Sequence, residues 1–557
     1  MKNSFDINKG TEQGHPLSPD LFKIYIKDLS PKLDFDNCPK LIDQLISHLL
    51  WADDLILLAL DPRTLQKQLD ELNNFCSQWG IEVNVDKTKL MVFNSQYAER
   101  YQVMPRIGKH SLKKVSSYCY LGIEIHETGS FAIARTELKK KAMRALYGLK
   151  NTVNKSKLSF RSLTTLFYSL IKPIVLYGAP IYTPTMSCLK SLVKLINQSS
   201  ESETILQGAP SILRNISNLN NEKVHLHFLK WALGVNRKAC NSGVWGESGR
   251  YPLIYESINL TLKYFKRLQN LNDGSLVSLA IQEQINLKLD WYKGIEPVLE
   301  LDSCFSSDHI TAYYSKTTDP FTNNSAHQDS RLTKKPQKEN FLIHNGFRKR
   351  IPEQTIKPNK SRIFQSNLIL KQLKSSFKIT WQKNVSSSSK LSYYSQLKTT
   401  FGKEQYLDHV TKYKDRANTT RLRISAHRLE IELGRYKKVP RYERTCAWCE
   451  IVFDDKKIEN EIHVLNQCDM NAAFRSQLVQ KINSLIQKDS DLITNESNFL
   501  KLISSHNTNS PPPEDNYQAH LSRIVSRYAT KCIDNRKKFL ESLDLNPNKI
   551  HNKKGQR

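Results

Sequence analysis

The sequence predicts an α+β fold in which strands are concentrated near the N-terminus and helices make up most of the remaining chain. An apolar run, residues 49–59, carries two adjacent aspartates at its centre, which is typical of a β-hairpin with its charge at the turn. Leu65, Leu69 and Leu72 then begin a helical repeat with one apolar face. From Phe131 onward, apolar residues recur mainly at helical spacing.

Length and charge narrow the class of protein. A chain of 557 residues is long for one core, so we expect two to four domains. Its 83 Lys and Arg against 54 Asp and Glu give a net charge of +29, which favours nucleic acid as the partner. We find no signal peptide, lipidation motif or membrane-spanning run, and ten scattered cysteines favour a reducing compartment. We therefore expect a nuclear or cytoplasmic protein that does not bind membranes.

The aspartates Asp53 and Asp54 are the first candidate site. Burying two like charges costs several kcal/mol unless a cation or hydrogen bonds offset the cost. Because neighbouring strand residues point to opposite faces, only a tight turn lets both carboxylates reach one ion. The alternative is an ordinary Asp-Asp turn between two core strands.

Turn and helix signals surround this hairpin. Glycines and prolines in residues 10–19 predict a turn, with Ser18 as the N-cap and Pro19 as the first residue of a helix that ends at Leu29. Gly14 beside Gln13 lets backbone and amide approach a flat ligand, although a plain loop before a core helix is the alternative. A second helix should start at Asp61 and end at Gly80. Residues 90–93 and 118–125 have strand character.

Taken in order, four segments resemble the palm of a non-LTR (LINE-type) retrotransposon reverse transcriptase. They are QGHPLSPDLF at 13–22, WADD at 51–54, WGIEVNVDKTKLMVF at 79–93 and YLGI at 120–123. The resemblance implies a partial polymerase palm, a β-hairpin with helices, followed by a mostly α-helical thumb and C-terminal region. It also implies RNA and DNA, as primer-template and element RNA, as partners.

The same resemblance assigns catalytic roles. Asp53 would be the principal carboxylate and Asp54 the weaker contributor to a two-ion Mg²⁺ site, since two-metal phosphoryl chemistry uses hard oxygen ligands. Lys87 would lie near the triphosphate and assist proton transfer, with a solvated surface lysine as the alternative. Trp51 departs from the family's usual Phe or Tyr.

Substrate contacts follow from the resemblance as well. Gln13 and Gly14 would line the surface beside the incoming nucleotide and template. Tyr120, Leu121 and Gly122 would grip the primer backbone.

One carboxylate of the family's Mg²⁺ site has no counterpart here. The family's remaining metal-binding aspartate lies on a strand well before the QG-PLSP turn, and only twelve residues precede Gln13. Asp6 falls in the lead-in to that turn and is not a substitute. We therefore expect an N-terminally truncated, incomplete Mg²⁺ site without autonomous polymerase activity. The alternative is a non-enzymatic nucleic-acid-binding protein with a structural zinc module.

The middle of the chain is predicted to be helical and basic. Leu138, Ala142 and Leu146 form one face of a helix that resembles the family's thumb, with Arg and Lys on the other face for duplex phosphates or for solvent. His225 and His227 are two apart on a helix, so a shared metal is not expected. Further on, the cations of residues 348–378 interleave with Phe347, Phe364, Phe377 and Trp381. This mixture suits RNA, or an ordinary basic helical domain.

A second candidate site combines three cysteines and a histidine. Cys446, Cys449, His463 and Cys468 form the pattern C-x2-C-x13-H-x4-C, which predicts a closed, structural Zn²⁺ set in a small zinc-knuckle-like module. Cys468 is about 140° from His463 on an ideal helix and should lie past the helix end. A chance arrangement without zinc is the alternative. The segment also resembles the C-terminal Cys/His segment of LINE-type reverse transcriptases.

These observations divide the chain into seven expected regions. They are a partial palm (1–126), thumb-like helices (127–200), a helical region (201–305), a linker (306–345), a basic helical region (346–440), the Cys3His module (441–480), and C-terminal helices with a basic tail (481–557).

Overall fold

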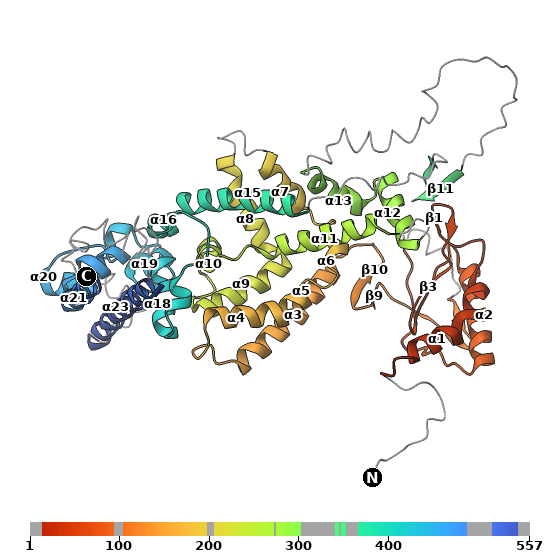
Figure 1. The fold of residues 1–557 in the computed structure, drawn as a ribbon, viewed down its shortest axis with the longest axis horizontal. Coiled ribbons are helices and arrows are strands. Elements are labelled where there is room, and N and C mark those ends of the chain that lie inside the picture. The colour runs from red at the N-terminus through yellow and green to blue at the C-terminus, as the bar shows by residue number, and fades with distance from the viewer. Residues whose placement is uncertain are drawn as a thin grey trace, which may run out of the picture. The chain divides into compact units, whose positions relative to one another are not determined.

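The computed structural model forms two compact units, which we describe separately (Figure 1). The first comprises residues 1–134 and 263–364, and the second comprises residues 135–262 and 365–557. The structure describes residues 14–93, 104–197, 205–271, 275–301, 340–344, 347–351, 366–486 and 515–543. Most of the expected linker 306–345 and the whole tail 546–557 lie outside these ranges.

The first unit combines short two-stranded sheets with helices, which confirms the α+β expectation. Its elements are α1 Ser18–Ile26, the 3-10 helix η1 Lys27–Leu33, β1 Lys40–Leu41, β2 Gln44–Leu45, β3 His48–Trp51, β4 Asp54–Leu57, α2 Pro62–Trp79, β5 Lys89–Leu90, β6 Arg106–Ile107, β7 His110–Ser111, β8 Lys113–Lys114, β9 Ser117–Tyr120, β10 Ile123–His126, α12 Leu276–Asn286, α13 Asp290–Leu299, β11 Asn340–His344 and β12 Phe347–Ile351.

Helix α2 is the scaffold of this unit. The Asp61 carboxylate accepts hydrogen bonds from the backbone N–H groups of Arg63 (2.7 Å) and Thr64 (3.0 Å), which caps the helix as expected. Gly80, at φ +64°, ends it in the left-handed conformation. Leu69 and other apolar residues of α2 form a core with η1 and with the half-buried side of β4.

Helix α1 differs from the expectation. It spans Ser18–Ile26, and Leu17 rather than Ser18 occupies the cap position. The chain then tightens into η1, so fewer apolar side chains face the core: Ile26 is buried, whereas Leu21 and Tyr25 are 53% and 42% exposed. The expected strand at 90–93 is also shorter, because only Lys89–Leu90 pairs, in parallel, with β8.

The second unit is helical in its described residues. Its elements are α3 Ala132–Thr152 (from Arg135), α4 Phe160–Leu166, the π-helical segment η3 Phe167–Ile171, α5 Lys172–Val175, α6 Ala179–Tyr182, α7 Cys188–Asn197, α8 Ile205–Asn218, α9 Asn220–Leu233, α10 Asn241–Ser248, α11 Leu253–Gln269 (to Leu262), α15 Ser366–Ser387, η6 Ser389–Leu391, α16 Ser392–Leu397, α17 Tyr406–His409, α18 Tyr413–Arg423, α19 Glu430–Tyr436, η7 Arg441–Glu443, α20 Ala447–Phe453, the π-helical segment η8 His463–Gln467, η9 Asp469–Asn471, α21 Ala472–Ile486 and α23 Asp515–Ser542.

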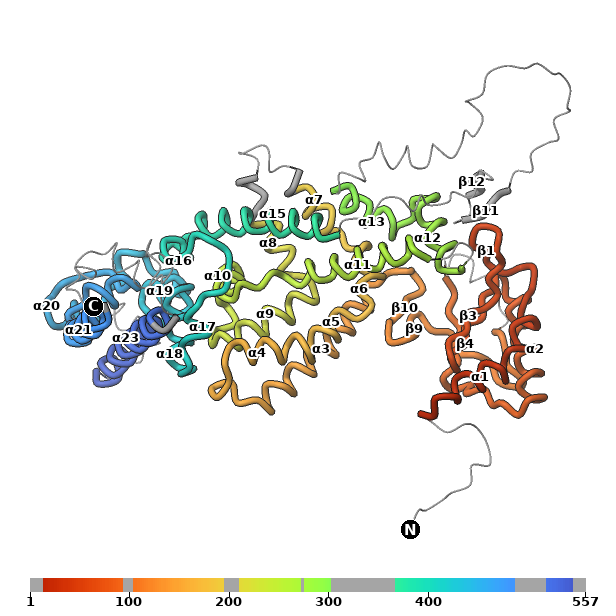
Figure 2. Tube along the Cα trace, viewed as in Figure 1, coloured from red at the N-terminus to blue at the C-terminus, as the bar shows by residue number. Residues whose placement is uncertain are grey.

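Segments far apart in sequence pack together in this unit. Helix α23 lies beside α18 and α21 (Figure 2), and Leu422, Leu478 and Tyr528 share one apolar core. None of the described helices is long and apolar enough to cross a bilayer.

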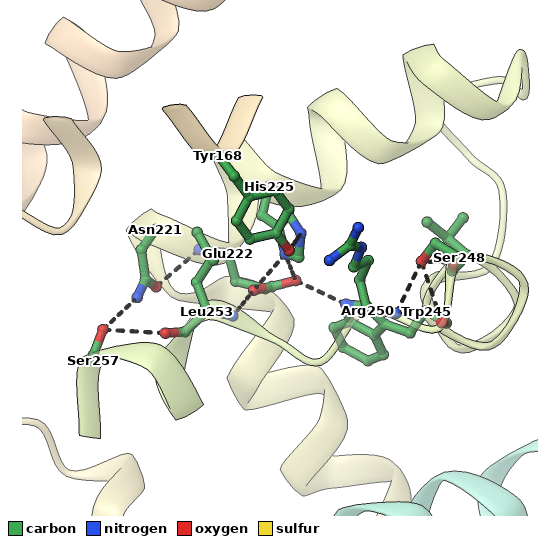
Figure 3. A network of polar contacts seen from close by, with 10 residues as sticks. Tyr168, Asn221, Glu222, His225, Trp245, Ser248, Arg250, Leu253 and Ser257 are labelled. Atoms are coloured by element: carbon green, nitrogen blue, oxygen red, sulfur yellow. Dashed lines mark hydrogen bonds and ion pairs between the residues drawn. The ribbon is translucent and has the colours of Figure 1, made fainter. Parts of the chain in front are cut away.

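A buried glutamate joins three helices of the second unit (Figure 3). Glu222, fully buried on α9, accepts hydrogen bonds from the Trp245 indole N–H (2.8 Å) and the Leu253 backbone N–H (2.6 Å). It also lies 3.2 Å from His225 Nδ1. A buried carboxylate is tolerated when it is hydrogen-bonded in this way, so Glu222 fixes α9 against α10 and α11.

A second buried network links the segments before and after residues 263–364. Arg423 on α18 donates to both carboxylate oxygens of Glu247 at 3.1 Å and lies 2.7 Å from Glu404. Tyr406 Oη donates to Glu247 at 2.6 Å, and Lys398 pairs with Glu404. Although burial opposes its charge, Glu247 and Glu404 hold the pKa of Arg423 above its usual value.

For Phe377 and Trp381, the structure supports an ordinary basic helical domain rather than the expected contact of aromatic rings with RNA. Phe377 is 1% exposed and Trp381 is fully buried, so neither ring can stack on a base. Both lie on the apolar face of α15, and the Trp381 indole N–H donates to the Ser242 carbonyl (2.8 Å). Phe347 lies in strand β12 rather than a helix, and Phe364 lies outside the described residues.

We predict that Gly249→Ala destabilises the second unit by about 2–4 kcal/mol. Gly249 has φ +61°, and an added Cβ would lie 2.2 Å from the Lys403 backbone nitrogen, which adds a steric clash to the left-handed penalty. Gly402→Ala is the control, because an added Cβ there meets open space, and we expect a change below about 1 kcal/mol. Urea unfolding measures both, and equal midpoints would contradict the prediction.

Candidate functional site

The two aspartates lie at the tip of the β3–β4 hairpin. The strands are antiparallel and pair Trp51 with Asp54, so Ala52 and Asp53 form a two-residue turn. Ala52 adopts φ +54° to close it. The expected hairpin with charge at its turn is confirmed, since Asp53 lies in the turn and Asp54 is the first residue of β4.

The hairpin tip is exposed, which corrects the expectation of a buried pair between core strands. Asp53 and Asp54 are both exposed, and Trp51 is 65% exposed. The reason is that β3 and β4 are four residues long and, within the described chain, pair only with each other. Water therefore solvates both carboxylates, and the desolvation cost that suggested a bound cation does not arise.

The base of the hairpin is fixed by Gln68, a residue that the sequence analysis did not identify. Its buried amide nitrogen lies within hydrogen-bond distance of the carbonyls of Leu33 (3.1 Å), Ser47 (3.1 Å) and Leu58 (3.3 Å). It thus joins α2 and η1 to the residues that flank the hairpin strands. A glutamine beside Leu69 on an apolar helix face was the available signal.

A second hairpin, β9–β10, carries the other predicted contact residues. Leu121 (φ +47°) and Gly122 (φ +81°) form its two-residue turn, as in type I′ hairpins. Burial raises the pKa of Tyr120, and the negative charge of Asp54 raises it further. The structure therefore brings Tyr120 into the electrostatic field of the aspartate hairpin.

The remaining predicted site residues are Lys87, Gly14 and Gln13. Lys87 lies exposed in a turn whose backbone N–H donates to the Asn84 carbonyl (3.2 Å), and its own carbonyl accepts from Tyr118 Oη (3.4 Å). Gly14 is exposed with φ +94°. Gln13 lies outside the described residues.

The four predicted ligands Cys446, Cys449, His463 and Cys468 meet in one buried cluster. Their candidate ligand atoms all lie within 4.8 Å of one another. The Sγ atoms of Cys446 and Cys449 are 4.0 and 3.9 Å from that of Cys468, and Cys449 Sγ is 3.4 Å from His463 Nε2. A tetrahedral zinc with Zn–S near 2.3 Å needs S–S separations of about 3.8 Å, so these distances fit the ion.

Local structure explains how the cluster forms. Cys446 caps α20 and Cys449 lies in its first turn. His463 begins η8 and Cys468 follows its end, as expected from their angular separation. The Cys446 backbone N–H donates to the Lys457 carbonyl (2.8 Å), which closes the loop between the two halves.

The thiols of the cluster are electrostatically coupled. The hydrogen bond with Cys468 lowers the pKa of Cys446 to about 4. Burial raises the pKa of Cys449 to about 11. Three thiolates this close would repel one another, and a divalent cation removes that repulsion.

The described part of the chain contains no other metal-binding group of three or more His, Cys, Asp or Glu side chains. His225 and His227 point to different surroundings, as expected: His225 is buried against Glu222 and Phe167, and the His227 ring contacts that of Tyr147.

The aspartate hairpin lies in a segment that matches a known protein family. Residues 2–125 match the reverse transcriptase (RNA-dependent DNA polymerase) family. A transposon-derived protein of Caenorhabditis elegans is 32% identical over 142 residues, covering 25% of this chain and 49% of that protein. The Pol polyprotein of the type-2 retrotransposable element R2DM of Drosophila melanogaster is 31% identical over 128 residues, covering 22% of this chain and 12% of the polyprotein.

A third relative matches over a longer stretch. The RNA-directed DNA polymerase of the Drosophila melanogaster mobile element jockey is 22% identical over 220 residues, which cover 37% of this chain and 23% of that polymerase. This chain thus spans less than half of each of the three relatives. The resemblance to non-LTR retrotransposon reverse transcriptases is confirmed.

We predict that Gln68→Leu loosens the aspartate hairpin. The substitution removes the buried amide donor that the Leu33, Ser47 and Leu58 carbonyls share, although Ser47 still accepts from the Leu58 N–H (2.7 Å). The loss should cost about 1–3 kcal/mol, and hydrogen–deuterium exchange in residues 47–58 should accelerate. Gln78→Leu, an exposed change on the same helix, is the control and should leave exchange unchanged. Equal protection in the two variants would show that Gln68 does not anchor the hairpin.

Proposed function

We propose that this chain, whose residues 2–125 resemble non-LTR reverse transcriptases, binds RNA and primer-template through a polymerase palm segment. The observation that carries the proposal is the exposed β3–β4 tip with Asp53 and Asp54, where the charge of Asp54 acts on Tyr120 of the second hairpin. Exposed carboxylates at a tight turn can reach a cation held by substrate phosphates.

In this proposal Asp53 and Asp54 would hold Mg²⁺, with Asp53 the main ligand. When bound, Mg²⁺ neutralises charge on the transferring phosphoryl group. Tyr120, Leu121 and Gly122 would support the primer backbone, while Gln13 and Gly14 would lie beside the nucleotide and template. Lys87 would lie near the triphosphate.

We further propose that the chain alone does not extend a primer. Two-metal phosphoryl transfer requires carboxylates that bridge and orient both ions, and adjacent residues of a single turn supply little of that geometry. Among the described residues, no third acidic group joins the Asp53–Asp54 pair in a cluster able to hold a metal. The chain would then act as a nucleic-acid-binding protein.

Zn²⁺ is proposed as the structural ion of the Cys3His cluster. The distances, the burial of the four ligands and the coupled thiols support a closed set with no open position for substrate. Salt bridges from Arg536 on α23 to Glu459 hold the loop before His463. The ion would therefore stabilise both the module and its contact with the C-terminal helix.

Primer extension and metal binding test the palm proposal. We expect the intact chain to bind a primer-template with steep salt dependence and to show no extension with Mg²⁺ or Mn²⁺. We expect Mn²⁺ bound at the hairpin, detected by electron paramagnetic resonance, to be lost in Asp53→Asn.

Asp43→Asn is the matched control for this change. Asp43 is exposed in the β1–β2 turn and follows Ile42 at φ +55°, much as Asp53 follows Ala52 at φ +54°. Extension by the wild type that Asp53→Ala abolishes would overturn the proposed inactivity. Absence of binding to RNA and primer-template at low salt would overturn the binding function.

Metal analysis tests the zinc proposal. We expect about one zinc per chain, lost in the Cys446→Ser, Cys449→Ser double variant together with thermal stability of the module. The Cys119→Ser variant, which changes an exposed cysteine outside the cluster, should keep the ion. Unchanged zinc content in the double variant would refute the assignment.

A further inference from the structure

The second unit contains a cavity of about 1190 Å³ that no role proposed above uses. Helices α3, α9, α18 and α23 form its wall together with the loop that follows α9. Nine Lys and Arg side chains line it, and Asp534 is the one carboxylate among its described lining residues. Asp534 is paired with Lys414 at 2.6 Å, so the cavity carries a large excess of positive charge.

Part of this charge has a structural role. Lys155 Nζ donates to the Trp231 carbonyl (3.3 Å), and Arg421 Nε donates to the Gly234 carbonyl (2.7 Å). The first contact joins the segment after α3 to the end of α9, and the second joins α18 to the loop after α9. Lys223, Arg237 and Arg428, in contrast, are exposed at the cavity, where their charges face solvent.

The cations of the cavity repel one another. Burial, followed by the charges of Arg237 and Lys155, lowers the pKa of Lys150 to about 8. Burial and the neighbouring cations lower the pKa of His227 to about 4. A bound anion would relieve this repulsion, so the cavity favours a polyanion over a neutral ligand.

Aromatic rings add a second chemical feature. Lys150 and Lys155 lie over the Trp231 ring at 5.6 and 5.5 Å, so cations occupy that ring. Lys150 also lies over the Tyr147 ring at 5.6 Å, but Tyr147 remains 44% exposed at the cavity, and its ring contacts His227 edge-on. An exposed ring among cations suits an unpaired base attached to a phosphate backbone.

We propose that this cavity binds a single-stranded segment of nucleic acid, with phosphates on Lys223, Arg237 and Arg428 and a base against Tyr147. The proposal rests on the nucleic-acid-binding function proposed above and assigns it a site outside the palm segment. A duplex is excluded as the occupant because its bases are already stacked and cannot meet Tyr147.

The test measures fluorescence anisotropy of a labelled single-stranded RNA with the full chain across a salt series. One variant combines Lys223→Gln, Arg237→Gln and Arg428→Gln. The matched control combines Lys157→Gln, Arg161→Gln and Lys190→Gln, which remove the same charge from exposed positions of this unit that do not line the cavity.

The cavity variant should lose roughly tenfold or more in affinity, and its slope of log affinity against log salt should fall by about 2, since each single-strand phosphate contact contributes about 0.7. The control should change less than about twofold. Equal losses would overturn the cavity site while leaving the binding function intact. A wild-type chain that fails to bind RNA would overturn both proposals.

Tyr147 provides an independent readout. Tyr147→Leu should reduce quenching of a 2-aminopurine base in the single strand, whereas Tyr147→Phe should preserve it because the ring remains. A duplex of the same length should compete poorly with the single strand. Equal competition by duplex, or equal quenching in the Leu and Phe variants, would overturn the single-strand assignment.

Discussion

The second unit depends on the buried contact between Arg423 and the two glutamates Glu247 and Glu404. Glu247 and Arg423 are 176 positions apart in the chain, yet each is 1% exposed or less. Removing one partner of a buried ion pair commonly costs about 3–5 kcal/mol, because the remaining charge is buried alone. The charges of Lys398 and Glu404 make the network balanced overall. Helices α10 and α18 therefore have to meet before the unit is stable.

Helix α18 also contacts other parts of the unit. It packs beside α23, and its Arg421 holds the loop that closes one side of the basic cavity. Helix α23 in turn contacts the Cys3His region, with Arg536 on Glu459 at 2.6 Å and Phe539 against Trp448 among the contacts. The proposed zinc cluster and the proposed single-strand site thus share one structural support.

The aspartate hairpin has a different basis for its stability. Its base is hydrogen-bonded by buried Gln68, while its tip lies in solvent. A hydrogen-bonded base with an accessible tip suits a site whose ligand arrives with a substrate, because the carboxylates stay hydrated until that moment. The Cys3His cluster has the opposite design. Its four ligands are buried and lie within 4.8 Å of one another, which suits a resident ion that contributes to folding.

The sequence by itself determined the features that depend on neighbouring residues. Helix α2 has its cap at Asp61 and its end at Gly80, the β3–β4 turn falls at Asp53, and Cys468 lies past a helix end, all as predicted. The resemblance of residues 2–125 to reverse transcriptases was also evident from short sequence motifs. Each of these follows from local backbone preferences or from ligand spacing. The catalytic and substrate-contact roles assigned to site residues remain predictions.

Only the tertiary structure decided what is buried and what is brought together. Asp53 is exposed although its neighbours are apolar, because the hairpin has no further strand beside it among the described residues. Trp381 is buried although its basic surroundings suggested a nucleic-acid contact. The role of Gln68 depends on the packing of α2 against the base of the hairpin. The basic cavity depends on the packing of α3, α9, α18 and α23. Burial and charge clustering depend on contacts between distant segments, which local sequence patterns do not encode.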